Sequence, residues 1–178
     1  MRRSGYTVYA TVRKEADAAA LRELSLATLV PILCDVTDSA SIAAAVTTIE
    51  AAGVPLIAVV NNAGITKDLP VEIQPLASFR QVCDVNYFGA LDVTQQFLPL
   101  LRKAGPGAPI VTIGSLACWI SLPGTAAYMY SGTKHALEAL SCQRRAAPGT
   151  SARHLCLAYQ TRAAHMLRPR SASKQSRR

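Results

Sequence analysis

Apolar residues fall into short runs along most of the chain, and these runs alternate with stretches of helical spacing. The β-branched and aromatic run at 6–12 predicts a strand, and residues 15–24 have the pattern of a helix. The apolar run at 29–34 predicts a second strand. A capping Asp or Ser then opens a further helix, which Gly53 ends. The first third of the chain therefore predicts strand, helix, strand and helix in that order.

The same alternation continues to about residue 143. The run at 55–60 is apolar without alternation, which is typical of a strand buried on both faces of a parallel sheet. A turn at 61–64 leads to a helix at 85–103, a fourth strand at 110–113 and a last helix at 131–143. Repeated strand and helix units predict an α/β fold with a Rossmann-like, doubly wound parallel sheet.

The pattern ends after residue 143. Residues 144–178 show neither strand nor helix periodicity, are rich in Arg, Ser and Ala, and contain no acidic residue. We therefore expect one α/β domain at 1–143 and a basic, disordered tail at 144–178. The abrupt loss of pattern also raises the hypothesis of a shifted reading frame or an abnormal gene end, which sequencing of the gene and transcript would test.

The net charge of +8 belongs to the tail. Residues 1–138 hold ten Lys and Arg against eleven Asp and Glu, whereas residues 139–178 hold nine Lys and Arg and no acid. A polybasic arm for nucleic acid or acidic lipid is one interpretation. The tail has little aromatic interleaving and no groove-reading fold, so we do not expect a nucleic-acid partner.

Cysteine usage and hydropathy bear on the compartment. The five cysteines are an odd number and widely spaced, so they predict neither a disulfide framework nor a paired zinc motif. No apolar run reaches the roughly 18 residues of a membrane-spanning helix. We expect a protein without a transmembrane segment in the reducing environment of the cytoplasm.

Four elements carry candidate chemistry, and their order is informative. Asn-Asn-Ala-Gly at 61–64 follows a buried strand, Asn86 lies in a helix, Ser115 follows a strand, and Tyr130 and Lys134 lie at a helix start. A Tyr-x-x-x-Lys alone is commonplace, but four elements in this order at strand–helix spacing are specific. Together they resemble the short-chain dehydrogenase/reductase family.

The resemblance covers about residues 5–142 and implies catalytic roles for four residues, Asn86, Ser115, Tyr130 and Lys134. It implies hydride transfer between NADP(H) and a secondary alcohol or carbonyl substrate. In this family's pattern Lys134 holds the nicotinamide ribose, Ser115 orients the substrate carbonyl, and Asn86 supports the lysine through a water relay. Without the family, Ser115 reads as a plain strand-end hydroxyl.

Elementary chemistry supports the Tyr-Lys pair. Tyr130 and Lys134 are four residues apart, so on a helix their side chains project from one face. A tyrosine hydroxyl in a peptide ionises near pH 10, which is too high for a useful base at neutrality, and a neighbouring ammonium favours the phenolate. The structural alternative is a surface aromatic beside a solvated charge.

The spacing leaves two candidates for the active tyrosine. Thirteen residues after Ser115, the family's usual separation, lies Tyr128, whereas the distance to Lys134 selects Tyr130. We favour Tyr130, because one helical turn fixes the Tyr-Lys relation while a loop absorbs two extra residues at little cost.

The resemblance also implies a set of cofactor-binding residues. An acidic residue after a strand reads the adenine, small residues let the backbone approach the adenosine, and a guanidinium past the first strand suits a 2′-phosphate, which favours NADP over NAD. An exposed Arg or a turn Asp without such a role is the alternative. The set is Arg13, Asp35, Val36, Asn61, Ala63, Gly64, Tyr130 and Lys134.

Two features of the family pattern have no counterpart in this sequence. The Gly-rich turn that places a helix amino terminus against the pyrophosphate is not found, and the residues after Ser141 do not continue as the family's further strand. Domain 1–143 is therefore expected to be a partial dehydrogenase domain, a homo-oligomer if intact. The alternative function is a non-catalytic remnant that acts as an interaction module.

Overall fold

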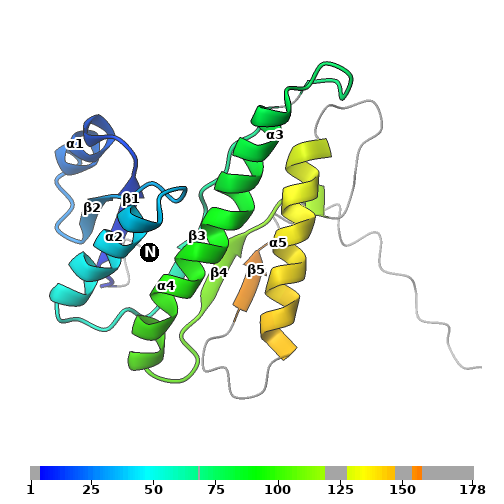
Figure 1. Ribbon diagram of the computed structural model, residues 1–178. Coiled ribbons are helices and arrows are strands. Elements are labelled where there is room, and N and C mark those ends of the chain that lie inside the picture. Colours follow the sequence, from blue (N-terminus) through cyan, green and yellow to red (C-terminus); the bar gives the residue numbers. More distant parts are fainter. Residues whose placement is uncertain (1–4, 68, 119–127, 147–153, 158–178) are drawn as a thin grey trace, which may run out of the picture.

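The computed structural model describes four stretches of the chain, residues 5–67, 69–118, 128–146 and 154–157. Strands and helices alternate along them (Figure 1). The strands are β1 (Val8–Val12), β2 (Leu29–Leu33), β3 (Val59–Asn61), β4 (Ile110–Ile113) and β5 (His154–Leu157). The helices are α1 (Glu15–Glu23), α2 (Ser39–Ala51), α3 (Leu76–Cys83), α4 (Gly89–Lys103) and α5 (Tyr128–Ala146), with a π-helix η1 (Asp84–Phe88) and a 3₁₀ turn η2 (Leu116–Cys118).

The strands form two sheets, and within each sheet neighbouring strands are parallel. β1 pairs with β2, and β4 lies between β3 and β5. The amide of Val8 and the carbonyl of Val12 bond to the β2 side, so the peptide groups of Tyr9 and Thr11 point to the opposite edge. In the part of the chain that the structure describes, that edge of β1 and the outer edge of β3 are not paired with each other. The α/β class is confirmed, with a sheet that is incomplete between β1 and β3.

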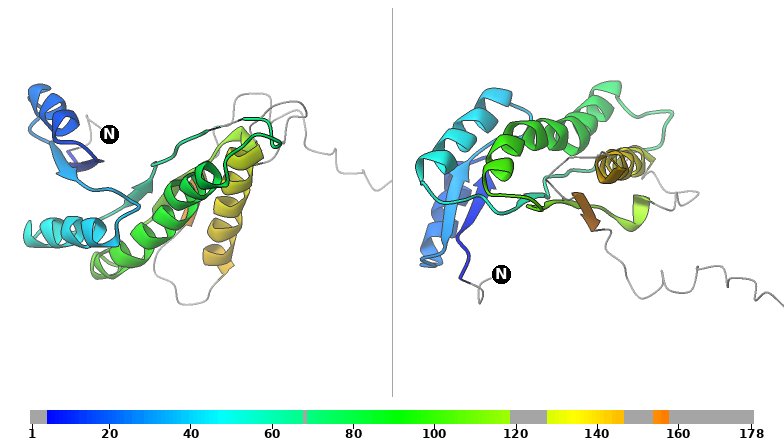
Figure 2. Two further views of the ribbon diagram at one scale, coloured as in Figure 1. Left: turned by 45° about the horizontal axis from the view of Figure 1, so that its top comes forward. Right: turned by 90° about the horizontal axis from the view of Figure 1, so that it is seen from below.

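Three helices cover one face of the strands. α2, α4 and α5 lie on this face, and α1 lies on the other, beside β1 and β2 (Figure 2). The packing of α2 against α4 joins the two sheets into one core. This core holds the buried residues Ile32, Cys34, Ile42, Ala45, Ile49, Phe97 and Leu100.

The strand expected at 55–60 differs from the expectation. β3 starts only at Val59, and Val60 and Ile57 are 45% and 48% exposed. Burial on both faces was therefore wrong here. Val59 and Asn61 face α4, but among the described residues no helix covers Val60 from the other side, so one apolar face of β3 is open.

The helix expected at 85–103 begins earlier, at Leu76. Pro75 occupies the N-cap position, where its missing N–H costs nothing, and α3 runs directly into η1 and α4. The π-helical turn inserts extra backbone in the middle of this run. None of the helices that the structure describes is both long and apolar enough to cross a membrane.

Two expectations near the carboxyl end also change. α5 starts at Tyr128 and continues to Ala146, past the boundary placed at residue 143. β5 then pairs in parallel with β4 from His154 to Leu157, so the expectation that no strand follows α5 was wrong for these residues. Strand pairing supplies backbone hydrogen bonds that a sequence period does not report. The rest of the tail expected at 144–178 lies outside the described residues.

The two halves of the domain approach each other tightly at Gly89, the first residue of α4. A Cβ built on Gly89 would lie 2.8 Å from the Val36 carbonyl oxygen and 2.9 Å from a Val36 methyl group. These distances are shorter than a van der Waals contact, so only glycine lets α4 pass the loop that follows β2.

We predict that Gly89→Ala lowers the free energy of unfolding by about 1–3 kcal/mol, because the added methyl group overpacks a backbone contact. Gly132→Ala in α5 is the matched control: a Cβ there meets nothing within 4 Å, and alanine is the better helix former. Urea unfolding monitored by circular dichroism measures both variants. Equal midpoints for the two variants would contradict the proposed close approach.

Candidate active site

Tyr130 and Lys134 lie side by side in the first turns of α5. The Lys134 side chain is only 4% exposed, and its Nζ donates to the backbone carbonyl of Ile113 at 2.8 Å. The same Nζ is 5.5 Å from the centre of the Tyr130 ring. The residue pair is therefore held at the carboxyl end of β4, where parallel sheets of this type bind ligands.

Tyr128 occupies a different environment. It is the first residue of α5 and is 37% exposed. The ring that the Lys134 amine faces is that of Tyr130, two residues further along the helix. Most of the segment that joins Ser115 to these tyrosines, residues 119–127, lies outside the described residues.

Asn86 is completely buried in η1 and connects three elements. Its Nδ2 donates to the Ile65 carbonyl at 2.9 Å and to Thr133 Oγ1 at 3.1 Å, and its Oδ1 accepts from the Ile65 amide at 2.8 Å. The segment after β3, the π-helical turn and α5 are thus tied together by one amide side chain. Both N–H groups of the amide are engaged in protein contacts.

Gly64 lies next to the side chains of Asn86 and Lys134. A Cβ built on Gly64 would be 3.6 Å from Asn86 Oδ1 and 3.8 Å from Lys134 Nζ. A side chain at position 64 would therefore extend into the space beside the lysine amine. Gly64, one of the residues predicted to line a cofactor, therefore lies beside Asn86 and Lys134.

Ser115 follows β4 and has a local structural task. Its Oγ accepts from the Ala117 amide at 3.2 Å and so starts the 3₁₀ turn η2. This contact matches the strand-end interpretation of the serine. The residue is at the same edge of the sheet as Lys134, whose amine bonds to Ile113.

The Asn61 side chain points away from that edge. It is buried at the end of β3, and its Nδ2 donates to Thr94 Oγ1 at 3.0 Å and to the Ala90 carbonyl at 3.4 Å. The amide therefore fastens β3 to α4. Any contact of Asn61 with a cofactor would have to use its backbone.

Asp35 and Arg13 lie just beyond the carboxyl ends of β2 and β1. Asp35 Oδ1 accepts from the Thr37 amide at 2.9 Å and from Thr37 Oγ1 at 2.7 Å. These two bonds hold the pKa of the Asp35 carboxyl below its usual range, and the positive charge of Arg13 adds a smaller contribution in the same direction. Arg13 is therefore near enough for its positive charge to lower the pKa of the Asp35 carboxyl.

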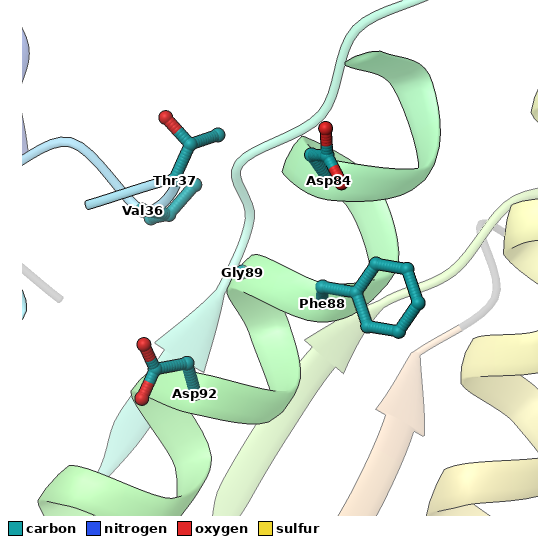
Figure 3. A pocket seen from close by; sticks show the side chains of 6 residues that line it. All are labelled: Val36, Thr37, Asp84, Phe88, Gly89 and Asp92. Carbon is teal, nitrogen blue, oxygen red and sulfur yellow. The ribbon is translucent and has the colours of Figure 1, made fainter. Parts of the chain in front are cut away.

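A shallow pocket of about 210 Å³ opens beside Val36 (Figure 3). Val36 and Thr37 face the helix that carries Asp84, Gly89 and Asp92. The lining contains two carboxylates and no basic side chain, so it does not suit a phosphate group. Tyr130 and Lys134 do not line this pocket, so we do not assign the candidate catalytic site to it.

Comparison with known proteins agrees with this arrangement. The family model described as short chain dehydrogenase matches residues 1–148. The uncharacterized oxidoreductase YusZ of Bacillus subtilis is 37% identical over 141 residues, which are 76% of this chain and 49% of YusZ. The chain therefore spans about half the length of the curated relatives it matches.

Two solved structures share the fold. Serine dehydrogenase from Escherichia coli superposes with a TM-score of 0.76 at 26% identity. The matched part is 87% of this chain and 71% of the serine dehydrogenase chain. The Pseudomonas aeruginosa RhlG/NADP active-site complex gives a TM-score of 0.79 at 25% identity. The matched part is 93% of this chain and 68% of the RhlG chain. The chain belongs to the short-chain dehydrogenase/reductase family, and its Rossmann-like fold is confirmed.

The contacts of Asp35 predict a pH effect. Because its pKa is lower in the folded chain than in the unfolded chain, the carboxylate stabilises the fold above the unfolded pKa, and this contribution is lost as the pH falls through the folded pKa. Thr37→Val removes the hydroxyl donor and keeps the amide. We expect the Asp35 pKa to rise toward its unfolded value, so that this carboxylate stabilises the fold less above the unfolded pKa and its contribution is fully lost at a higher pH.

Carbon-detected NMR titration of the Asp35 carboxyl group and acid unfolding curves measure the two effects. Thr47→Val on α2 is the matched control, because in the described part of the chain the Thr47 hydroxyl donates to the Ala43 carbonyl and has no hydrogen bond to a carboxylate. An Asp35 titration curve that is the same in the parent and in Thr37→Val would refute the assigned cause.

Proposed function

We propose that this chain carries the active site of an NADP(H)-dependent oxidoreductase that interconverts a secondary alcohol and a carbonyl compound. The observation that carries this proposal is the position of the Lys134 amine, 5.5 Å from the Tyr130 ring and bonded to the end of β4. The amine is buried and fixed, so it presents a defined positive charge to the phenol. Family membership supplies the reaction type.

Tyr130 acts as the proton donor and acceptor. In reduction, its hydroxyl gives a proton to the carbonyl oxygen of the substrate, and in oxidation the phenolate takes that proton back. A nicotinamide cofactor, when bound, supplies or accepts the hydride. In this proposal the Lys134 amine, fixed beside the Tyr130 ring, also holds the nicotinamide ribose.

Ser115 and Asn86 complete the proposed catalytic group. The Ser115 hydroxyl orients the substrate carbonyl from the end of β4, with Ala117 as its anchor. Asn86 keeps the Ile65 segment and α5 at a fixed separation through its three hydrogen bonds. The resulting site takes a small-molecule substrate.

The residues present fit one end of a dinucleotide better than the other. Glycine at position 64 places no side chain against Asn86 and Lys134, and we propose that the nicotinamide ribose approaches the backbone there. By the family pattern, Ala63 and the backbone of Asn61 would line the adenosine side.

At the adenine end, the Asp35 carboxylate and Val36 follow β2 and meet the adenine. Arg13 follows β1 and would pair with a 2′-phosphate, which favours NADP, although NAD is also possible. The NADP complex of the structural relative RhlG supports this choice.

The protein as a whole we propose to be cytoplasmic and homo-oligomeric. We also propose that the chain divides into a dehydrogenase domain at 1–143 and a tail at 144–178. Gel filtration with light scattering measures the oligomeric state directly.

The first functional prediction concerns the two tyrosines. Tyr130→Phe should bind NADPH with an affinity close to that of the parent but lose carbonyl reduction by roughly 10²–10⁴-fold, because the proton donor is removed. Tyr128→Phe should retain activity and serves as the matched control. Oxidation of NADPH in the presence of a panel of ketones, followed by absorbance, gives the rates. Loss of activity in Tyr128→Phe alone would reverse the assignment.

The second functional prediction concerns cofactor choice. Arg13→Ala should weaken NADPH binding by about tenfold, a loss of about 1.4 kcal/mol, and leave NADH binding nearly unchanged. Fluorescence titration of the two reduced cofactors measures the ratio, and Arg22→Ala on α1 is a control for the loss of a surface guanidinium. No response of the parent to millimolar NADPH would favour the alternative, a non-catalytic interaction module.

A further inference from the structure

Thr133 is hydrogen-bonded to both Asn86 and the backbone of Tyr130. The residue is buried in α5 with 4% exposure. Its Oγ1 accepts from Asn86 Nδ2 at 3.1 Å and donates to the backbone carbonyl of Tyr130 at 2.8 Å. The hydroxyl therefore uses its one proton on the helical turn of Tyr130 and a lone pair on Asn86.

These bonds form a continuous path across the site. The Ile65 backbone is bonded twice to Asn86, Asn86 is bonded to Thr133, and Thr133 is bonded to the Tyr130 carbonyl. A second support reaches the same helix from the sheet through the bond of Lys134 to Ile113. The turn that carries the phenol is thus held from two sides by different groups.

We infer that Thr133 is a positioning residue, which sets the place of Tyr130 by relaying the Asn86 contact to its backbone. The inference deepens the proposed function and rests on it for the chemistry at the phenol. Position matters because proton transfer requires a heavy-atom distance of about 2.6–3.2 Å, and a displacement of about 1 Å can cost about a hundredfold in rate.

The hydroxyl is the part of Thr133 that does this. A valine side chain has the same shape but neither accepts nor donates, so Thr133→Val leaves one buried N–H of Asn86 without its partner. Thr133→Ser keeps the hydroxyl and loses only the methyl group. The two variants therefore separate the hydrogen bonds from the packing.

The same helix offers a matched control. Ser141 is fully buried, and its Oγ donates to the Leu137 carbonyl at 2.8 Å, a bond to the preceding turn like that of Thr133. No bond links Ser141 to Asn86 among those seen in the described residues. Ser141→Ala thus reports the effect of losing a buried helix hydroxyl that lies outside the path.

The experiment is fluorine NMR of the full chain labelled with 3-fluorotyrosine. The chain has six tyrosines, and Tyr130→Phe identifies the Tyr130 signal by its loss. We expect Thr133→Val to shift or broaden this signal, and Thr133→Ser and Ser141→Ala to leave it in place. If Thr133→Val does not fold, as judged by circular dichroism, Thr133→Ala replaces it, because it places no methyl group against the Asn86 amide.

A Tyr130 signal unchanged in Thr133→Val would overturn the inference, and so would a shift in Thr133→Ser as large as that in Thr133→Val. A second readout is the pH dependence of ketone reduction: its midpoint should move in Thr133→Val and return in Thr133→Ser. NADPH titration of the parent tests the proposed function separately. If the parent fails to bind NADPH, the proposed function fails, while the fluorine spectra still decide whether Thr133 positions Tyr130.

Discussion

The amine of Lys134 must be hydrogen-bonded, because a buried ammonium without a partner costs several kcal/mol. The Ile113 carbonyl at the end of β4 meets this need and thereby fixes α5 to the sheet. Tyr130 stands one helical turn earlier, so the same bond decides where the phenol lies. The candidate chemistry therefore depends on β4 ending where it does and on α5 starting beside it, more than on any property of the tyrosine itself.

Side-chain hydrogen bonds fix how the strands and helices of this domain are positioned relative to one another, which apolar packing alone does not do. Asn61 bonds to Thr94 and holds β3 against α4, while Asn86 bonds to the Ile65 backbone and holds the segment after β3 against η1. Apolar contacts are not directional, whereas a buried amide with all its hydrogens engaged permits one arrangement. The π-helical turn at Asn86 fits this picture, since such turns reorient a side chain within an otherwise regular helix.

Local pattern was sufficient for some parts of the fold and not for others. The strand at Ile110–Ile113 was predicted because its apolar run and flanking breaks are local. For the N-cap of α2 the residue types left Asp38 and Ser39 as candidates, and the structure selects Asp38. Burial of β3 was not predictable, because it depends on which helices lie over it. β5 owes its existence to pairing with β4 and has no period of its own.

Much of the site was visible in the sequence as residue types at fixed spacings, but its connections were not. The four-residue spacing placed Tyr130 and Lys134 on one helix face, and the structure brings the two groups together. Thr133 carried no signal, since a threonine inside a helix is ordinary and only the approach of Asn86 distinguishes it. The one available clue was that it lies within the Tyr-x-x-x-Lys segment, next to the lysine.

The outer edges of β1 and β3 present backbone donors and acceptors beside half-open apolar side chains such as Val60. Edges of this kind are templates for any extended polypeptide, and natural proteins usually shield them with charge, proline or a covering segment. Among the described residues no second strand pairs with β1, so the amides of Tyr9 and Thr11 face an open edge there. The unpaired amides and carbonyls at such an edge can bond to any further extended backbone, whatever its side chains, so the gap between β1 and β3 has the chemistry to receive another strand.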